Sequence, residues 1–165
     1  MFKNIVFQTP TIIFGIDTVK QLGEQAKKLG AGRVLLVTGP RVKKAGLLEK
    51  TQSYLEAEGI EVEVNVQDRD TPEPATEVVE ATAAIAREGK FDVIIGLGGG
   101  SILDVTKMAS ALVTNPGVTQ DYFGREKVPL RGKPTIIVPT TAGTGAEVSK
   151  HAIFLDREIN VKKVV

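Results

Sequence analysis

The chain has 165 residues, of which 42% are hydrophobic and 25% charged, an ordinary composition for a globular domain with its own core. Its 21 basic and 20 acidic residues nearly cancel, so the net charge of +1 gives no electrostatic basis for binding nucleic acid or an anionic membrane. Cysteine is absent and histidine occurs once, at His151, which excludes disulfides, thiolate chemistry and a site of several imidazoles within one copy.

The first predicted elements are two short β-rich runs, residues 5–7 and 11–14, which are typical of a hairpin or a sheet-edge appendage. Asp17 then predicts the N-cap of a helix that ends at Gly30. The apolar residues on one face of that helix are Val19, Leu22, Ala26 and Leu29.

From residue 33 onward, predicted strands and helices alternate. The strands are expected at residues 33–38, 60–66, 92–96, 135–138 and 151–156. Helical periodicity lies between them, at residues 47–59, 74–89 and 102–112. Apolar strands separated by helices indicate βαβ units and a parallel sheet covered on both faces. The sequence therefore predicts an α/β, Rossmann-like fold with an N-terminal β-hairpin.

The strongest local signal is the run GLGGGS, residues 96–101, between a predicted strand and a predicted helix. Glycines let the backbone approach a phosphate closely, and the free amides that begin the helix supply donors and a positive dipole end. The run is not the G-x-G-x-x-G fingerprint, because Ser101 stands at the last glycine, and no Gly-Lys-Ser/Thr of a P-loop follows. Taken alone, it is also compatible with an ordinary strand-to-helix turn.

A second loop, PTTAGTGAE at residues 139–147, follows the next apolar strand. Three hydroxyls and two glycines thus leave the carboxyl edge of a parallel sheet, where ligands of open α/β sheets bind. A shared polyphosphate ligand explains two such loops at neighbouring strand ends better than two structural turns.

The stretches GGGSILDVTK (98–107) and PTTAGTGAE (139–147) resemble the two signatures of the iron-containing (group III) alcohol dehydrogenase family. Their spacing, the stretch 121–123 and the opening hairpin also fit, so the resemblance covers essentially the whole chain. It implies an oxidoreductase that interconverts alcohols with aldehydes or ketones using NAD or NADP. In that family a second, helical domain carries an aspartate and three histidines that bind iron or zinc. This sequence has no counterpart to them, so it predicts no catalytic or metal-binding residue and little or no activity for the isolated chain.

Carried over position by position, the resemblance implies a cofactor site. The pyrophosphate would be lined by Gly98, Gly99, Gly100 and Ser101. Phosphate, ribose and nicotinamide would be contacted from the opposite side by Thr140, Thr141 and Thr144, and a cofactor ribose by Lys162. Asp104 is also counted among the cofactor-site residues, and it would either cap its helix or face the substrate cleft. His151 is expected to be a packed or edge residue of an apolar strand, and Glu147 to be structural.

The residue after the first core strand indicates which of the two cofactors, NAD or NADP, is preferred. Family members that prefer NAD often have an aspartate there, and this chain has Gly39, followed by Pro40 and Arg41. Glycine leaves room for a 2′-phosphate, which Arg41, Lys43 or Lys44 can pair with. We therefore expect NADP to be preferred over NAD. The alternative is that Gly39-Pro40 is an ordinary turn and the basic residues are a solvated helix face.

The chain ends on Val164-Val165, without a closing helix or polar tail. Residues 1–165 are therefore expected to be one NAD(P)-binding domain of a longer, truncated polypeptide. Its expected partners are a C-terminal helical domain, a small alcohol or aldehyde, and a second copy through the hairpin. The sequence leaves open a non-catalytic nucleotide-binding module, or the equivalent domain of a glycerol dehydrogenase or dehydroquinate synthase. With no apolar run of about 20 residues and no signal-like N-terminus, a cytoplasmic location is expected.

Overall fold

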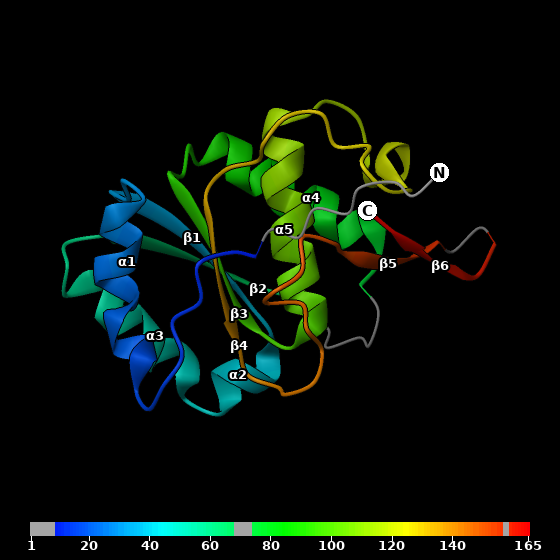
Figure 1. Cartoon of the computed structure of the whole chain (residues 1–165). Coiled ribbons are helices and arrows are strands. Elements are labelled where there is room, and N and C mark those ends of the chain that lie inside the picture. Colours follow the sequence, from blue (N-terminus) through cyan, green and yellow to red (C-terminus); the bar gives the residue numbers. More distant parts are fainter. Residues whose placement is uncertain (1–8, 68–73, 157–158) are drawn as a thin grey trace.

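The computed structural model describes residues 9–67, 74–156 and 159–165 (Figure 1). The described elements, in chain order, are η1 Thr18–Gln21, α1 Leu22–Lys28, β1 Arg33–Thr38, α2 Pro40–Lys44, α3 Leu47–Glu56, β2 Glu61–Val66, α4 Thr76–Glu88, β3 Val93–Gly98, α5 Gly100–Thr114, η2 Thr119–Tyr122, β4 Thr135–Pro139, β5 Ile153–Asp156 and β6 Val161–Val164. None of the described helices combines the length and apolar character needed to cross a bilayer.

The central sheet has the strand order β2-β1-β3-β4, and every pair in it is parallel. The chain places β2 on one side of β1 and then returns to place β3 on the other. The direction of sheet growth therefore reverses between β1 and β3, which creates a topological switch point at their carboxyl ends. These observations confirm the α/β, Rossmann-like fold.

Both faces of the sheet are covered by helices, which explains why its central strands are apolar throughout. Leu35, Val37 and Ile94 point to the face on which α4 and α5 pack. Their neighbours Val34 and Leu36 point to the opposite face, against α1 and α3. Figure 1 shows these two helical layers on either side of the strands. Edge strand β2 instead alternates between exposed and partly buried positions from Glu61 to Val64, and Asn65 and Val66 are both partly buried.

The N-terminal region differs from the prediction. Residues 5–7 lie outside the described residues, and residues 11–14 are described but form no strand, so the second half of the predicted hairpin is wrong here. Asp17 adopts a left-handed conformation (φ 59°) and makes no capping hydrogen bond. Its carboxylate pairs instead with Lys20, at 2.7 Å, and a 3₁₀ turn precedes α1. Asp17 thus occupies the N-cap position of η1, but its side chain forms this ion pair and not the predicted capping hydrogen bond.

The C-terminal strands form a separate antiparallel pair, β5 with β6. The predicted strand 151–156 is shorter than expected, because β5 begins at Ile153 and His151 precedes it. The buried residues Ala152 and Phe154 pack into the same core as α4 and α5. The small sheet is thereby attached to the helical layer of α4 and α5. The glycine-rich turn, residues 96–101, leads into α5 of this layer.

Asp92 provides a pH-dependent contribution to stability at the amino-terminal edge of the sheet. The backbone N–H groups of Arg33 and Gly32 each donate to its Oδ2 at 2.9 Å, and they hold the pKa of this carboxyl below its usual range. Since the folded pKa lies below the unfolded value of about 3.9, the contribution is present above that pH and is lost as pH falls through the folded pKa.

We therefore expect Asp92→Asn to lower the free energy of unfolding by about 1 kcal/mol or less at neutral pH, with partial exposure limiting the effect. The variant should also flatten the acid limb of a stability-versus-pH curve measured by urea denaturation. Asp17→Asn, which removes an exposed ion pair, is the control, and its effect should vanish at high salt. An acid limb identical to that of the unsubstituted chain would show that Asp92 does not contribute in this way.

Candidate cofactor site

Three loops leave the carboxyl edge of the central sheet side by side. Gly39 follows β1, Gly99 follows β3, and Thr140 follows β4. Because β1, β3 and β4 are parallel, their carboxyl ends meet at one edge, and β1 and β3 flank the switch point. The fold therefore brings together the two glycine-containing loops that the sequence singled out and the start of α2.

Two glycines of β3, Gly96 and Gly98, allow α5 to pack closely on the strand. A Cβ at Gly98 would lie 2.8 Å from Cβ of Ile102, and one at Gly96 would lie 2.6 Å from Oγ1 of Thr106. Both distances are shorter than real contacts, so neither position accepts a side chain without movement of the helix. Gly98 is also the last residue of β3, so its absent side chain serves helix packing and its predicted phosphate contact stays a prediction.

The next two glycines lie beneath the threonines of the second loop. A Cβ at Gly99 would lie 3.4 Å from Oγ1 of Thr141, and one at Gly100 would lie 3.1 Å from Cγ2 of Thr144. Because these two glycines have no side chains, Thr141 and Thr144 can lie directly over the start of α5.

We call residues 140–149 the hydroxyl loop. It is joined to the glycine-rich turn by a hydrogen bond from the Thr140 N–H to the Gly98 carbonyl oxygen, at 2.9 Å. Thr140, Thr141 and Thr144 are exposed to solvent. The structure therefore places three accessible hydroxyl groups beside the glycine-rich turn.

The N-terminus of α5 is available to an anion. Gly99 is its N-cap residue and no side chain caps the helix there. The first amides of any α-helix lack intrahelical partners, and they carry the positive end of the helix dipole. Gly100 and the half-buried Ser101 contribute such amides. Backbone donors and nearby hydroxyls are the groups that bind phosphate at helix N-termini.

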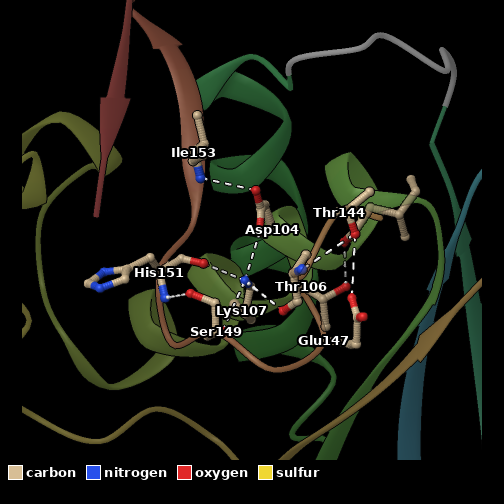
Figure 2. A network of polar contacts seen from close by, with 10 residues as sticks. Asp104, Thr106, Lys107, Thr144, Glu147, Ser149, His151 and Ile153 are labelled. Carbon is tan, nitrogen blue, oxygen red and sulfur yellow. Dashed lines mark hydrogen bonds and ion pairs between the residues drawn. The ribbon is translucent and has the colours of Figure 1, made fainter. Parts of the chain in front are cut away.

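Asp104 and Lys107 form a largely buried ion pair on α5, with Oδ1 and Nζ 2.8 Å apart and each side chain 13% exposed (Figure 2). Asp104 also accepts a hydrogen bond from the Ile153 N–H, at 3.0 Å, through Oδ2. The predicted cap is wrong, because α5 begins at Gly100 and Asp104 is bonded to β5 instead. Its predicted contact with a cofactor stays a prediction. Lys107 is not among the predicted site residues, although a lysine three residues after an aspartate on an apolar helix is a recognisable signal of an ion pair.

Beside β1, Gly39 is buried and is the N-cap residue of α2, which begins with Pro40. Its dihedral angles, φ −113° and ψ 164°, are those of extended backbone that any residue can adopt. Arg41, Lys43 and Lys44 of the same short helix are exposed.

A cavity of about 560 Å³ adjoins the glycine-rich turn on the face that carries α4 and α5. It is lined by residues of β2, α4 and α5, among them Asn65, Gln67, Val78, Thr82, Ser101 and Ile102. The Gln67 amide donates to the Thr82 hydroxyl oxygen at 3.1 Å. This size is within the range of small-molecule sites, so the site has room beyond the phosphate-sized space at the helix N-terminus.

One residue predicted to bind the cofactor lies apart from this cluster. Lys162 is on β6, opposite Leu155, and therefore belongs to the second sheet. His151 is half-buried, and its backbone N–H donates to Ser149 Oγ at 3.0 Å. Glu147 accepts a long hydrogen bond of 3.4 Å from the Thr144 hydroxyl.

Within the described ranges no three His, Cys, Asp or Glu side chains are grouped so as to hold a metal ion. These residues therefore do not provide the donor set that an iron or zinc site needs.

Comparison with known proteins places this arrangement in a family. The long-chain-alcohol dehydrogenase 1 of Geobacillus thermodenitrificans is 40% identical over 154 residues, which cover 92% of this chain and 38% of that protein. An alcohol dehydrogenase from Oenococcus oeni superposes with a TM-score of 0.90 at 30% identity, over 98% of this chain and 43% of the other. The sulfoacetaldehyde reductase of Bifidobacterium kashiwanohense, solved in complex with NAD+, superposes with a TM-score of 0.82 at 28% identity, over 98% and 43%.

The chain thus spans about two fifths of the length of these relatives. A sequence profile described as iron-containing alcohol dehydrogenase matches residues 9–165, which is nearly the whole chain. The chain belongs to the iron-containing alcohol dehydrogenase family.

Proposed function

We propose that residues 1–165 are the dinucleotide-binding domain of an NAD(P)-dependent alcohol dehydrogenase that interconverts alcohols with aldehydes or ketones. The observation that carries this proposal is the junction of the glycine-rich turn and the hydroxyl loop at the carboxyl edge of the sheet, joined by the Thr140–Gly98 hydrogen bond. That junction combines an uncapped helix N-terminus, glycines that keep the approach open, and exposed hydroxyl groups.

In this proposal the backbone amides of Gly100 and Ser101 bind the pyrophosphate, and the hydroxyls of Thr140, Thr141 and Thr144 hold it from the other side. The residues of this chain bind and orient the dinucleotide, and the hydroxyl loop excludes water from one side of it. When bound, the nicotinamide accepts or donates the hydride that is exchanged with the alcohol carbon. The described residues offer no metal donor set, so stabilisation of an alkoxide is not assigned to them.

For the choice of cofactor, we propose that NADP is preferred over NAD. Gly39 places no carboxylate at the end of β1, and the exposed Arg41, Lys43 and Lys44 follow it. Against this stands the structural relative that was solved with NAD+, so NAD is the alternative. By family, we also infer a helical domain as the partner that completes the substrate cleft, pairing of two copies through the N-terminal segment, and a cytoplasmic location.

The experiment is calorimetric titration of NAD and NADP into the 165-residue chain. We expect saturable binding with one dinucleotide per chain. Alcohol-dependent reduction of the cofactor by the same sample should be far below the ordinary turnover range of about 1–10³ s⁻¹, because nothing described here stabilises the alkoxide. Absence of binding by either dinucleotide would contradict the proposal.

A further inference from the structure

We propose that Lys107, held by Asp104, is a positioning residue that fixes the hydroxyl loop over the N-terminus of α5. This inference rests on the proposed binding of a dinucleotide at that place. It assigns to Lys107 a role in cofactor affinity although the side chain lies about two helical turns from Gly100.

The ammonium group of Lys107 binds backbone carbonyl groups at and just beyond the C-terminal end of the hydroxyl loop. Its Nζ donates to the carbonyl oxygens of Ala146 at 3.0 Å and Ser149 at 3.3 Å, and also to that of His151 (Figure 2). One side chain thus holds three backbone carbonyl groups spread over six residues. A lysine in this position orders the path of the main chain rather than contacting another side chain of the loop.

Asp104 makes this arrangement stable in a buried setting. A buried cation is costly unless an opposite charge and hydrogen bonds compensate it, and Asp104 supplies the opposite charge at 2.8 Å. The second oxygen of the same carboxylate accepts from the Ile153 N–H, at the start of β5. The pair therefore ties α5 both to the end of the hydroxyl loop and to the small sheet.

The hydroxyl loop needs such an anchor because its own backbone is permissive. Gly143 and Gly145 have φ values of 92° and 66°, and a Cβ at either would meet nothing within 4 Å. The loop is held at its start by the Thr140–Gly98 hydrogen bond and at its end by Lys107, so these two anchors bracket Thr141 and Thr144. Ordering the loop before the ligand arrives lowers the entropic cost of binding.

The test compares Lys107→Met with the matched control Lys150→Met, in which the same change is made at an exposed lysine that pairs with Glu126. Methionine keeps the helix propensity and approximate length of lysine but cannot hold the carbonyl groups. We expect Lys107→Met to weaken NAD and NADP binding about tenfold each, because both share the pyrophosphate. Lys107→Arg should recover part of the loss, and Lys150→Met should bind like the unsubstituted chain.

Two further readouts separate positioning from general stability. Hydrogen exchange at the amides of Val148 and Ser149, which donate to the Gly145 carbonyl, should accelerate in Lys107→Met while exchange in β1 and β3 is unchanged. Thr144→Val should weaken binding in the unsubstituted chain and add little in Lys107→Met, since the loop is already displaced. If Lys107→Met does not fold, Lys107→Gln is used, and the same directions are expected.

Unchanged dissociation constants in Lys107→Met, with only a lower melting temperature, would overturn the inference. Fully additive effects of Thr144→Val and Lys107→Met would also overturn it. If the unsubstituted chain binds neither NAD nor NADP, the proposed function fails instead. The exchange rates at Val148 and Ser149 then decide by themselves whether Lys107 orders the loop.

Discussion

A Gly99→Val chain is expected to fold and to lose at least two decades of affinity for NAD and NADP. Gly99 has extended dihedral angles, φ −78° and ψ 177°, and a Cβ there would lie 3.4 Å from the nearest atom of Thr141. The fold therefore tolerates a side chain at this position, but the side chain occupies the approach to the first amides of α5. Each charge-assisted hydrogen bond contributes about 1.5–3 kcal/mol, so losing two corresponds to about two to four decades in Kd.

The matched control is Gly32→Ala, which adds a Cβ at the opposite, amino-terminal edge, 3.5 Å from Asp92 Oδ2. It should leave both dissociation constants unchanged, and Gly99→Ala should give an intermediate loss. Titration calorimetry supplies the affinities, and urea denaturation shows that the variants are folded. A folded Gly99→Val chain that still binds either dinucleotide normally would show that the phosphate does not bind at the N-terminus of α5.

The second large effect is expected for the choice of cofactor. Gly39→Asp should reverse a preference for NADP, because the new carboxylate repels a 2′-phosphate and accepts hydrogen bonds from the ribose diol of NAD. The backbone at Gly39 is extended, so aspartate introduces no backbone strain. A contact of Arg41 with the phosphate would contribute about 1.5–3 kcal/mol, which is about one to two decades in Kd. Arg41→Ala should therefore weaken NADP and leave NAD nearly unchanged.

Both cofactors must be titrated at one moderate salt concentration, because screening weakens a solvent-exposed phosphate contact. Lys150→Met serves again as a control for removal of a surface positive charge away from β1. Equal affinities of the unsubstituted chain for the two cofactors, or a Gly39→Asp variant that still prefers NADP, would return Gly39-Pro40 to the status of an ordinary turn. Binding of the dinucleotide itself would be unaffected by that outcome.

The core of the fold is predictable because its signals are local. The strand predicted at residues 33–38 coincides with β1, and the strand predicted at residues 135–138 differs from β4 by one residue. Runs of apolar residues bounded by glycine or proline are sufficient there, since both faces of the sheet are covered. The two signature loops are likewise read from composition alone, and the parallel sheet brings them to one edge.

Two features could not be predicted because contacts between residues distant in the sequence decide them. The carbonyl groups that hold Lys107 come from residues 146–151, and no local pattern reports such a contact. Asp104 likewise accepts a hydrogen bond from the distant Ile153 amide and does not cap α5. The failure at Asp17 is local, because Lys20, three residues later, competes with the helix amides for the carboxylate. Helix packing accounts for the lack of a side chain at Gly98, and its contact with a phosphate stays a prediction.

Backbone amide chemical shifts of the ¹⁵N-labelled chain can map where a dinucleotide binds. During titration with NAD or NADP, we expect the largest shift changes at Gly99, Gly100 and Ser101 and in the hydroxyl loop, residues 140–149. The amides of Gly32 and Arg33, at the opposite edge of the sheet, should not respond. Saturable binding whose shift changes lie away from the carboxyl edge, with the amide shifts at the start of α5 unchanged, would show that the dinucleotide binds elsewhere on the chain.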